Sequence, residues 1–415
     1  MNQHFCIDLF AGAGGLSIGL EAAGFTCLYA NEVSPAYSAT LEKSHPNALV
    51  ETGDIRLVDS ASVRRTLQMN KGDLSLLAGG PPCQGFSVNA PIRSTDDQRN
   101  HLFRDYLRFV EEFEPKTVLI ENVPGMLSFE KGQTVKEIIK ALDQLGYAAT
   151  VRILYAAHYG VPQMRWRAFI LGNRLGVDPH EMFPIPTHFA KGRANFTKSL
   201  DGQNLVLPND VVNDITTLPF TNVEAAIGDL PAIKASDSEV DSAKYISEPD
   251  NDFQRYVRSS SKRPANHKCS GLGPTNMERL PYIPQGGSWR DIPHDLLPEG
   301  MKRARRSDHT KRYGRLHPEG LASTILTKCD PHWGSYIHPN EDRIISVREA
   351  ARFQAFPDHI QFYGSLTEQY QQVGNAVPPL LAQAIGTAIL SAVFNRTSSE
   401  RKLTPWHELQ LSMVV

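Results

Sequence analysis

The stretch that decides the fold lies close to the start of the sequence and reads Phe5-Cys-Ile-Asp-Leu-Phe-Ala-Gly-Ala-Gly-Gly-Leu16. An apolar run at 5–10 meets a glycine-rich turn, and an amphipathic stretch follows at 16–23. Glycines directly after a strand let the backbone approach a ligand closely, and they leave the N–H groups of the next helix exposed. The stretch therefore predicts a strand, a ligand-binding loop and a helix in succession.

The same alternation continues to about residue 175. Further apolar runs predict strands at 26–30, 74–78, 118–121 and 169–171. Amphipathic stretches between them predict helices at 35–43, 62–69, 102–113 and 135–145. Strands that alternate with helices are joined by crossovers and are covered on both faces, so we expect a mostly parallel sheet.

The pattern changes after about residue 176, where prolines multiply and no sustained period is visible. Regularity returns near Arg343. Ser346 and Glu349 have the spacing of a capping box, and Pro378-Pro379 stand where the first turn of another helix would begin. We therefore expect one α/β domain formed by 1–175 and 335–400. A second, smaller, loop-rich domain at 176–334 is inserted into it, and 401–415 form a tail.

Opposite charges are concentrated in two adjacent parts of the middle region, although the net charge of the whole chain is only −2. Residues 201–253 hold eleven Asp/Glu and two Lys, a net charge of −9. Residues 255–315 hold fourteen Lys/Arg and five Asp/Glu, a net charge of +9, and include Arg303, Arg305 and Arg306. A basic stretch with interleaved aromatic residues is typical of a surface that contacts phosphates. A solvated charged loop is the alternative.

The composition, 41% hydrophobic and 21% charged, is typical of a globular protein with room for two domains. We see no secretion leader and expect no membrane-spanning run, hence no membrane partner. The five cysteines are widely spaced, without a CxxC pair or a His/Cys cluster at zinc spacing. This argues against a disulfide framework and against a metal, and it fits the cytoplasm.

Two acidic residues follow expected strands where a nucleoside could bind. Glu32 closes the second strand, where a carboxylate can accept hydrogen bonds from ribose hydroxyls, and Asp54 is placed to meet an adenine or ribose edge. The dinucleotide fingerprint GxGxxG would need a glycine at Ser17, so that match is imperfect. The pattern indicates a nucleoside cofactor. A nicotinamide enzyme would share it, and a purely structural glycine turn is a further alternative.

A more specific element is Gly79-Gly-Pro-Pro-Cys83-Gln-Gly-Phe-Ser87, which follows an apolar run and precedes a polar loop. A cysteine in such a loop is placed to react, whereas most lone cysteines are small core residues. Glu121-Asn122 ends another apolar run, and a carboxylate there costs free energy unless it has partners. Gln163, Arg165 and Arg167 alternate along a further expected strand. We therefore expect them to share a face towards Glu121 or a bound base, or else to be surface arginines of an edge strand.

Together these segments resemble the cytosine-5 DNA methyltransferase family, in its prokaryotic, restriction-modification form. The resemblance rests on the order of six motifs and covers about 1–175 and 320–390. The motifs are DLFAGAGGL, GGPPCQGFS, ENVPGM, QMRWR, the stretch from Arg343 to Pro357 and the stretch from Gln372 to Pro378. It implies a doubly wound, mostly parallel, Rossmann-like methyltransferase domain. The middle region corresponds to the family's variable target-recognition domain, so no residue match is carried over there.

The resemblance implies S-adenosylmethionine as cofactor and duplex DNA as substrate, with the target cytosine flipped out. Cys83 would add to carbon 6 as a covalent nucleophile, with Glu121, Asn122, Arg165 and Arg167 as the other catalytic residues. Ser87 would lie near a phosphate, and Arg303, Arg305 and Arg306 would contact DNA. The implied cofactor site is Phe10, Gly12, Gly14, Leu16, Glu32, Val33, Asp54, Ile55, Leu102, Asn375 and Ala376. We also expect a monomer and a cognate restriction endonuclease.

Two other functions compete with this interpretation. An enzyme of the same chemistry could act on tRNA, but the long middle region with its basic block favours DNA. A non-catalytic DNA-binding protein could keep the fold, but Cys83, Glu121 and Arg165 are all present.

Overall fold

In the computed structural model, which describes residues 3–82, 102–234, 244–395 and 404–411, the chain divides into two units. The first unit holds Met1–Tyr159, Trp166–Pro219 and Val377–Val415, and the second holds Gly160–Arg165 and Phe220–Ala376. These boundaries differ from the expected ones, because 176–219 lie in the first unit and 335–376 in the second. The reason is packing, since the helices at 347–353 and 366–375 pack against each other and the first of them packs on the helix at 223–227.

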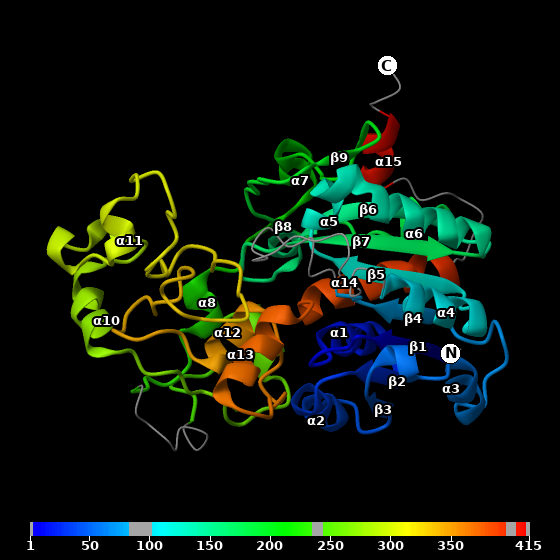
Figure 1. Ribbon diagram of the computed structural model, residues 1–415, viewed down its shortest axis with the longest axis horizontal. Coiled ribbons are helices and arrows are strands. Elements are labelled where there is room, and N and C mark those ends of the chain that lie inside the picture. The colour runs from blue at the N-terminus through cyan, green and yellow to red at the C-terminus, as the bar shows by residue number, and fades with distance from the viewer. Residues whose placement is uncertain (1–2, 83–101, 235–243, 396–403, 412–415) are drawn as a thin grey trace. The chain divides into compact units, whose positions relative to one another are not determined.

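A seven-stranded sheet forms the centre of the described part of the first unit (Figure 1). Its strands are β1 (His4–Leu9), β2 (Phe25–Glu32), β3 (Leu49–Thr52), β4 (Leu76–Gly79), β5 (Thr117–Asn122), β6 (Ala148–Tyr155) and β7 (Trp166–Asn173). The spatial order is β3-β2-β1-β4-β5-β7-β6. The first five pair in parallel, and β7 is antiparallel to both β5 and β6. The expected mostly parallel, doubly wound sheet is confirmed.

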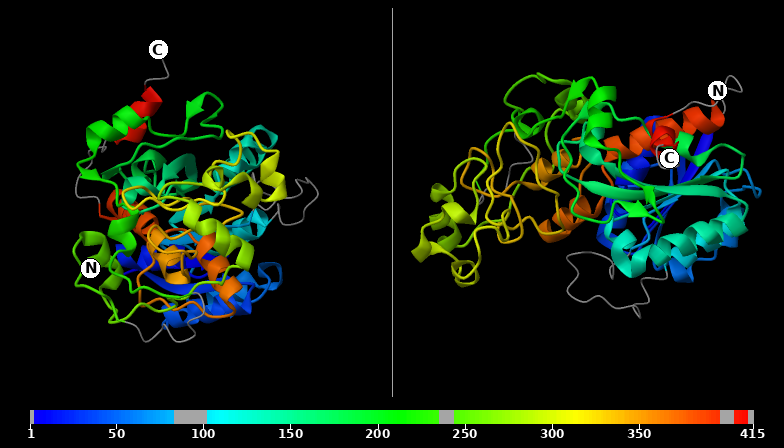
Figure 2. Two further views of the ribbon diagram at one scale, coloured as in Figure 1. Left: turned by 90° about the vertical axis from the view of Figure 1, so that its left-hand side faces the viewer. Right: turned by 90° about the horizontal axis from the view of Figure 1, so that it is seen from above.

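Helices cover both faces of this sheet (Figure 2). They include α1 (Gly15–Ala23), α2 (Pro35–Ser44), α3 (Ser60–Thr66), α4 (Phe103–Phe113), α5 (Gly125–Ser128), α6 (Gln133–Gln144) and α14 (Pro379–Ile389). Apolar residues of α3, α4 and α6 form one continuous core with the buried side chains of the strands. On the other face α1 packs against α14 so closely that a Cβ on Gly19 would lie 2.3 Å from the Pro379 oxygen.

Shorter elements complete the first unit. They are β8 (His188–Phe189), β9 (Ser199–Leu200), β10 (Gln203–Asn204), α7 (Asn209–Ile215), β11 (Leu218–Pro219) and α15 (Pro405–Leu411). The stretch Leu366–Phe394 is long and apolar enough to cross a membrane, by length and composition alone. Half of its most apolar window is buried in the structure, and core helices of soluble proteins pass the same test. Its central part, α14, is the helix that packs on α1.

The second unit consists of helices and irregular segments in its described part. Its helices are α8 (Val223–Ile227), α9 (Asp252–Arg258), α10 (Pro274–Arg279), α11 (Glu299–Lys302), α12 (Val347–Phe353) and α13 (Leu366–Asn375). The expected capping box is confirmed, because Ser346 Oγ accepts from the Glu349 N–H and the Glu349 carboxylate accepts from the Ser346 N–H. A small apolar cluster around Trp289, Tyr313 and Ile337 supports the loops between α10 and α12.

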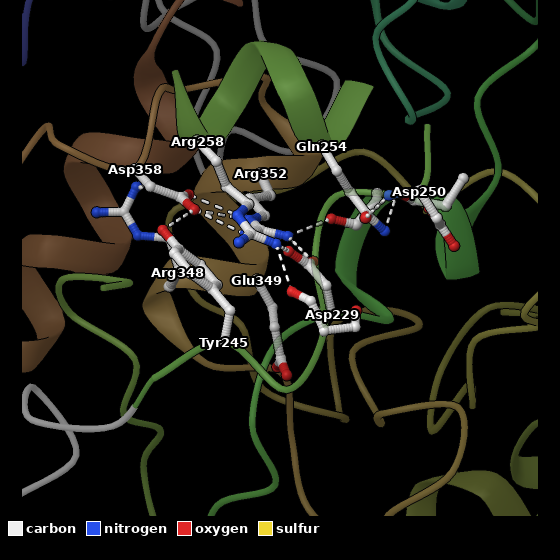
Figure 3. Close-up of polar contacts among 12 residues, drawn as sticks. Asp229, Tyr245, Asp250, Gln254, Arg258, Arg348, Glu349, Arg352 and Asp358 are labelled. Carbon is white, nitrogen blue, oxygen red and sulfur yellow. Dashed lines mark hydrogen bonds and ion pairs between the residues drawn. The ribbon is translucent and has the colours of Figure 1, made fainter. Parts of the chain in front are cut away.

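A buried ionic cluster joins four segments of the second unit (Figure 3). Arg352 of α12 binds Asp229 and Asp358, and its Nη2 lies 2.7 Å from Asp358 Oδ2. Arg258 Nη1 donates to Asp229 Oδ2 at 2.9 Å, and the Tyr245 hydroxyl donates to Asp358 at 2.8 Å. Burial opposes ionisation of Asp358, but nearby guanidinium groups outweigh it and hold its pKa below the ordinary value. The cluster therefore fixes both segments that flank 235–243.

Candidate active site

The segment that carries the expected nucleophile begins at the end of β4, in the middle of the sheet. Cys83 and Ser87 lie outside the described residues, whereas the glycines and prolines before them are described. A Cβ atom on Gly79 would lie 2.8 Å from a backbone oxygen of β1. A Cβ atom on Gly80 would lie 3.2 Å from Glu121 Oε2. Glycine at both positions therefore lets the chain leave the sheet directly beside the Glu121 carboxylate.

Glu121 forms an ion pair with Arg167 across the antiparallel strands β5 and β7. Arg167 Nε lies 2.8 Å from Glu121 Oε1, and the two side chains are 13% and 12% exposed. Arg167 Nη1 also donates to the carbonyl of Trp166 at 2.8 Å, which fixes the guanidinium. Burial lowers the pKa of Arg167, and Glu121 opposes that change. The pair places a nearly buried, oriented carboxylate beside Gly80, the first residue of the segment that leads from β4 to Cys83, here called the Cys83 loop.

Asn122, the last residue of β5, holds the same loop. Its Nδ2 donates to the Pro81 carbonyl at 3.0 Å, and its Oδ1 accepts from the Val123 N–H at 2.8 Å. The side chain is buried. Asn122 therefore positions the first residues of the Cys83 loop against β5.

The expectation that Gln163, Arg165 and Arg167 share one face of a strand is wrong. β7 begins only at Trp166, so Gln163 and Arg165 precede it and belong to the second unit. Arg165 is fully buried and donates to the carbonyls of Ile325 (3.1 Å), Gly374 (3.0 Å) and Ala376 (2.9 Å). Gln163 Nε2 donates to the Phe353 carbonyl at 2.7 Å. Both side chains join segments of the second unit, while Arg167 is the arginine paired with Glu121.

The glycine loop after β1 is held by Glu32. The Gly12 N–H donates to Glu32 Oε2 at 3.0 Å, and the Ser34 N–H donates to Oε1 at 2.8 Å. Burial raises the pKa of Glu32, and these N–H groups oppose that change. Phe10 and Gly12 both have a φ of 59°, and among the described residues no atom would lie within 4 Å of a Cβ on Gly12. The loop therefore borders open space beside an oriented carboxylate.

A second acidic residue lies at the end of β3. Asp54 accepts from the Arg56 N–H at 3.0 Å and pairs with the Arg56 guanidinium, which lowers the pKa of Asp54. Arg108 of α4 donates to the carbonyls of Ile55 (2.7 Å) and Val58 (2.6 Å) and so holds this turn. The Ile55 side chain is part of the core, and its carbonyl is already bound by Arg108.

The remaining expected cofactor residues differ in exposure. Val33 is 65% exposed, as a residue that lies against a ligand would be. Leu16 is buried in α1, and Leu102 packs on the core, partly buried. Asn375 and Ala376 lie at the end of α13 in the second unit, where the Ala376 carbonyl accepts from Arg165.

A mostly buried row of hydrogen-bonded polar side chains next to the glycine loop was not expected from the sequence. Asp8 Oδ2 accepts from the Ser17 N–H at 3.2 Å, and Ser17 Oγ lies 3.1 Å from His45 Nε2. His45 Nδ1 in turn lies 2.8 Å from Glu21 Oε2. Asp8 Oδ1 is buried without a hydrogen-bond partner in the described residues, and burial raises the pKa of Asp8 to about 7. In the sequence, only an acidic residue within an apolar strand, Asp8, four residues before Gly12, could have indicated these polar contacts.

The arginines expected to contact DNA follow α11 directly. Arg303, Arg305 and Arg306 are all exposed, and Arg306 Nη2 donates to the Arg290 carbonyl at 3.2 Å. Arg315 of the same basic block is buried instead, where it donates to the Leu280 and Ile283 carbonyls, among others. The positive charge of 255–315 is therefore only partly available to a ligand.

A mostly parallel sheet with a glycine loop after β1 and an acidic residue closing β2 defines an α/β domain that binds a nucleoside cofactor, a class that includes the methyltransferases that use S-adenosylmethionine. The site fits that cofactor, because it offers open space at Gly12, carboxylates for hydroxyl and amine donors and an exposed apolar Val33. Residues 5–391 match the family described as C-5 cytosine-specific DNA methylase. The chain belongs to this family, whose members use S-adenosylmethionine.

Individual relatives agree with this assignment. The chain is 34% identical to the type II methyltransferase M.AgeI of Thalassovita gelatinovora, over 93% of this chain and 99% of the relative. It is also 34% identical to the type II methyltransferase M.DdeI of Desulfomicrobium norvegicum, over 92% and 88% of the two chains. A prophage-encoded E. coli protein described as a DNA modification methyltransferase shares the fold. Its TM-score is 0.70 at 23% identity, and the match covers 95% of this chain and 100% of that one.

Proposed function

We propose that this protein methylates carbon 5 of a cytosine that is flipped out of a specific short duplex DNA sequence, with Cys83 as covalent nucleophile. The observation that carries the proposal is the Glu121–Arg167 ion pair beside Gly80, where the chain leaves the sheet towards Cys83. Membership of a family of cytosine-specific DNA methylases supports the substrate. Names of the similar bacterial proteins favour a restriction-modification enzyme.

The chemistry requires that carbon 5 becomes nucleophilic. Addition of the Cys83 thiolate to carbon 6 turns the ring into an enamine and moves negative charge towards nitrogen 3. A protonated Glu121 gives its proton to nitrogen 3, which neutralises that charge, and takes it back after methyl transfer, while Arg167 orients the carboxyl and pairs with it in its ionised form. Once carbon 5 carries the new methyl group, its proton leaves to a base and the thiolate is expelled, which restores the aromatic ring.

S-adenosylmethionine supplies the methyl group when it is bound. Glu32 is placed to accept hydrogen bonds from the ribose hydroxyls, and the exposed Val33 to pack against the adenine. Asp54 and the backbone of Ile55 are placed to meet the adenine edge. The loop from Phe10 to Gly14 offers backbone N–H groups and open space to the remainder of the cofactor.

Recognition of DNA is assigned to the second unit, through Arg303, Arg305, Arg306 and neighbouring side chains. Their exposure and positive charge suit contacts with phosphates, which position a protein on the duplex without reading its sequence. We infer further that the protein is a monomer of the bacterial cytoplasm and has a cognate restriction endonuclease as its genetic partner.

A substrate analogue tests the reaction in one experiment. Fluorine at carbon 5 cannot leave as a cation, so a duplex with 5-fluorocytosine at the target should trap the protein after methylation. We expect a denaturation-resistant adduct that forms only with S-adenosylmethionine and maps by mass spectrometry to the peptide with Cys83. Cys83→Ser should bind the cofactor normally and give no adduct. Methylation of the site without trapping would refute covalent catalysis, and an adduct on another cysteine would refute the choice of nucleophile.

A further inference from the structure

Trp333 is the most exposed of the tryptophans in the chain. Of the four tryptophans, Trp289 and Trp406 are buried, and Trp166 stacks on Tyr155 with ring centroids 4.3 Å apart. Trp333 is 54% exposed, although it lies in a short loop of the second unit with no strand or helix to display it. Leaving a tryptophan ring in water forgoes the free energy of burial, so its surroundings indicate what it faces.

The loop that carries Trp333 is rigid. Its turn is closed by the Trp333 N–H, which donates to the Asp330 carbonyl at 2.9 Å, and by the His332 N–H, which donates to Asp330 Oδ1 at 2.8 Å. The neighbouring segment clamps it, since the Tyr313 N–H donates to the Pro331 carbonyl at 2.6 Å. Further contacts join Ser335 Oγ to the Lys311 carbonyl and the Gly314 N–H to the Gly334 carbonyl. These hydrogen bonds hold the backbone of the turn in the conformation that exposes the Trp333 ring.

An arginine lies against the ring, and further basic residues lie on the segments that carry it. The Arg312 guanidinium lies 5.8 Å from the centroid of the Trp333 ring, within reach of a cation–π contact. His332 meets the ring edge-on, with centroids 5.4 Å apart. Lys311 and Lys328 are exposed on the two segments that meet here. The Asp330 carboxylate of this turn accepts a hydrogen bond from the His332 N–H. An apolar protein partner would have to desolvate these charges, whereas a nucleic acid would neutralise them.

We propose that Trp333 stacks on a nucleobase of the substrate DNA, with Arg312 and the adjacent lysines contacting the phosphates beside that base. The inference rests on the proposed function and adds a specific contact to it. A flat ring with a guanidinium on it presents a stacking surface and a positive charge, the two features with which proteins bind unstacked bases. A rigid turn makes this contact at a small entropic cost.

The first test measures binding of a duplex that carries the methylation site, found by mapping the marks in DNA from cells that express the chain. Trp333→Ala should weaken binding by about 5- to 150-fold, the range expected for one base–aromatic stack. Trp333→Phe should restore most of the affinity, because it keeps an aromatic face. Leu175→Ala removes an exposed apolar side chain of the first unit, away from the residues proposed to bind DNA, and should leave the affinity unchanged. S-adenosylmethionine should bind all variants equally.

The second test uses the fluorescence of the wild-type protein, with one conservative variant as the control. Acrylamide should quench Trp333 strongly in the free protein, and the site duplex should remove this quenching. In Trp333→Phe the strongly quenched part of the fluorescence should be missing, and the duplex should therefore not change the quenching. Continued quenching on the duplex, or wild-type affinity in Trp333→Ala, would overturn the stacking contact while 5-fluorocytosine trapping still supported the methyltransferase. Failure of wild-type protein to bind or trap DNA would instead refute the proposed function.

Discussion

Replacing Arg167 by methionine keeps the length of the side chain and removes the guanidinium that orients Glu121. Arg167 Nε lies 2.8 Å from the carboxylate, and the pair is almost buried. Glu121→Gln keeps the shape of the partner and removes its ability to deliver a proton. If Arg167 acts through Glu121, each single variant loses activity and the double variant loses no more than the worse single one.

The size of the effect follows from burial. Removing one preorganised polar group that supports the transition state costs about 2.7–4 kcal/mol, and the slight exposure of this pair favours the lower end. About 3 kcal/mol lost from the transition state corresponds to about a 10²-fold lower rate. General acid catalysis by Glu121 is worth about 10²–10⁴-fold. Independent roles would multiply these losses, whereas a shared role should leave the double variant within tenfold of Glu121→Gln.

The assay is single-turnover methyl transfer to a site-containing duplex, with enzyme and S-adenosylmethionine both saturating. Arg174→Met serves as the matched control, because its pair with Glu114 follows the same strand but is exposed to solvent. Thermal unfolding shows whether any variant has lost its fold. Multiplicative losses in the double variant, or a wild-type rate for Arg167→Met, would refute the argument that the arginine works by holding the carboxylate.

Three further changes probe other parts of the chain. Neutralising Arg303, Arg305 and Arg306 together should weaken duplex binding and lower the slope of log affinity against log salt by about 0.9 for each lost phosphate contact, with unchanged cofactor binding. An unaltered slope would make the basic run a solvated surface. Arg352→Met leaves Asp229 and Asp358 buried without their shared guanidinium, and should destabilise the second unit by about 3–5 kcal/mol in denaturant titrations. A variant as stable as wild type would contradict this estimate. Burial raises the pKa of Asp8 to about 7, so wild-type stability should decline from about pH 4 to above pH 7 through this group. Asp8→Asn should lack that decline, and parallel pH profiles would show that the carboxyl does not titrate there.

Much of the sheet could be predicted because its central strands are apolar and flanked by turns. The expected strands at 5–10, 26–30 and 74–78 correspond to β1, β2 and β4. The omitted strands, β3 and β6, lie at the two edges of the sheet. β3 has no buried residue, and β6 carries the buried Arg152, so neither shows the apolar run of a central strand. The reversal of β7 depends on pairing between distant segments, which periodicity does not encode.

The site could be predicted where it depends on local chemistry and not where it depends on packing. The acidic residues at the ends of β2 and β5 follow from sequence, because polar residues there interrupt apolar runs. The different partners of Arg165 and Arg167 could not be predicted in this way, because they depend on the residue at which β7 begins. Likewise, Arg315 counts towards the basic block in sequence but is bound to backbone carbonyls inside the second unit.

The register of the central strands explains why the expected catalytic and cofactor-binding residues lie together at the carboxyl ends of the parallel strands. Leu9 of β1 lies opposite Gly79 of β4, and Gly79 lies opposite Ile120 of β5. The cofactor loop, the Cys83 loop and Glu121 therefore lie at the carboxyl ends of three adjacent parallel strands, which are about 4.8 Å apart. A β7 parallel to β5 would begin at the amino ends of these strands, far from the end of β5. Because β7 is antiparallel, with Asn122 opposite Ala168, its first residues meet the end of β5 and bring Arg167 to Glu121. The one reversed connection in this sheet thus completes the acid–guanidinium pair on which the proposed chemistry depends.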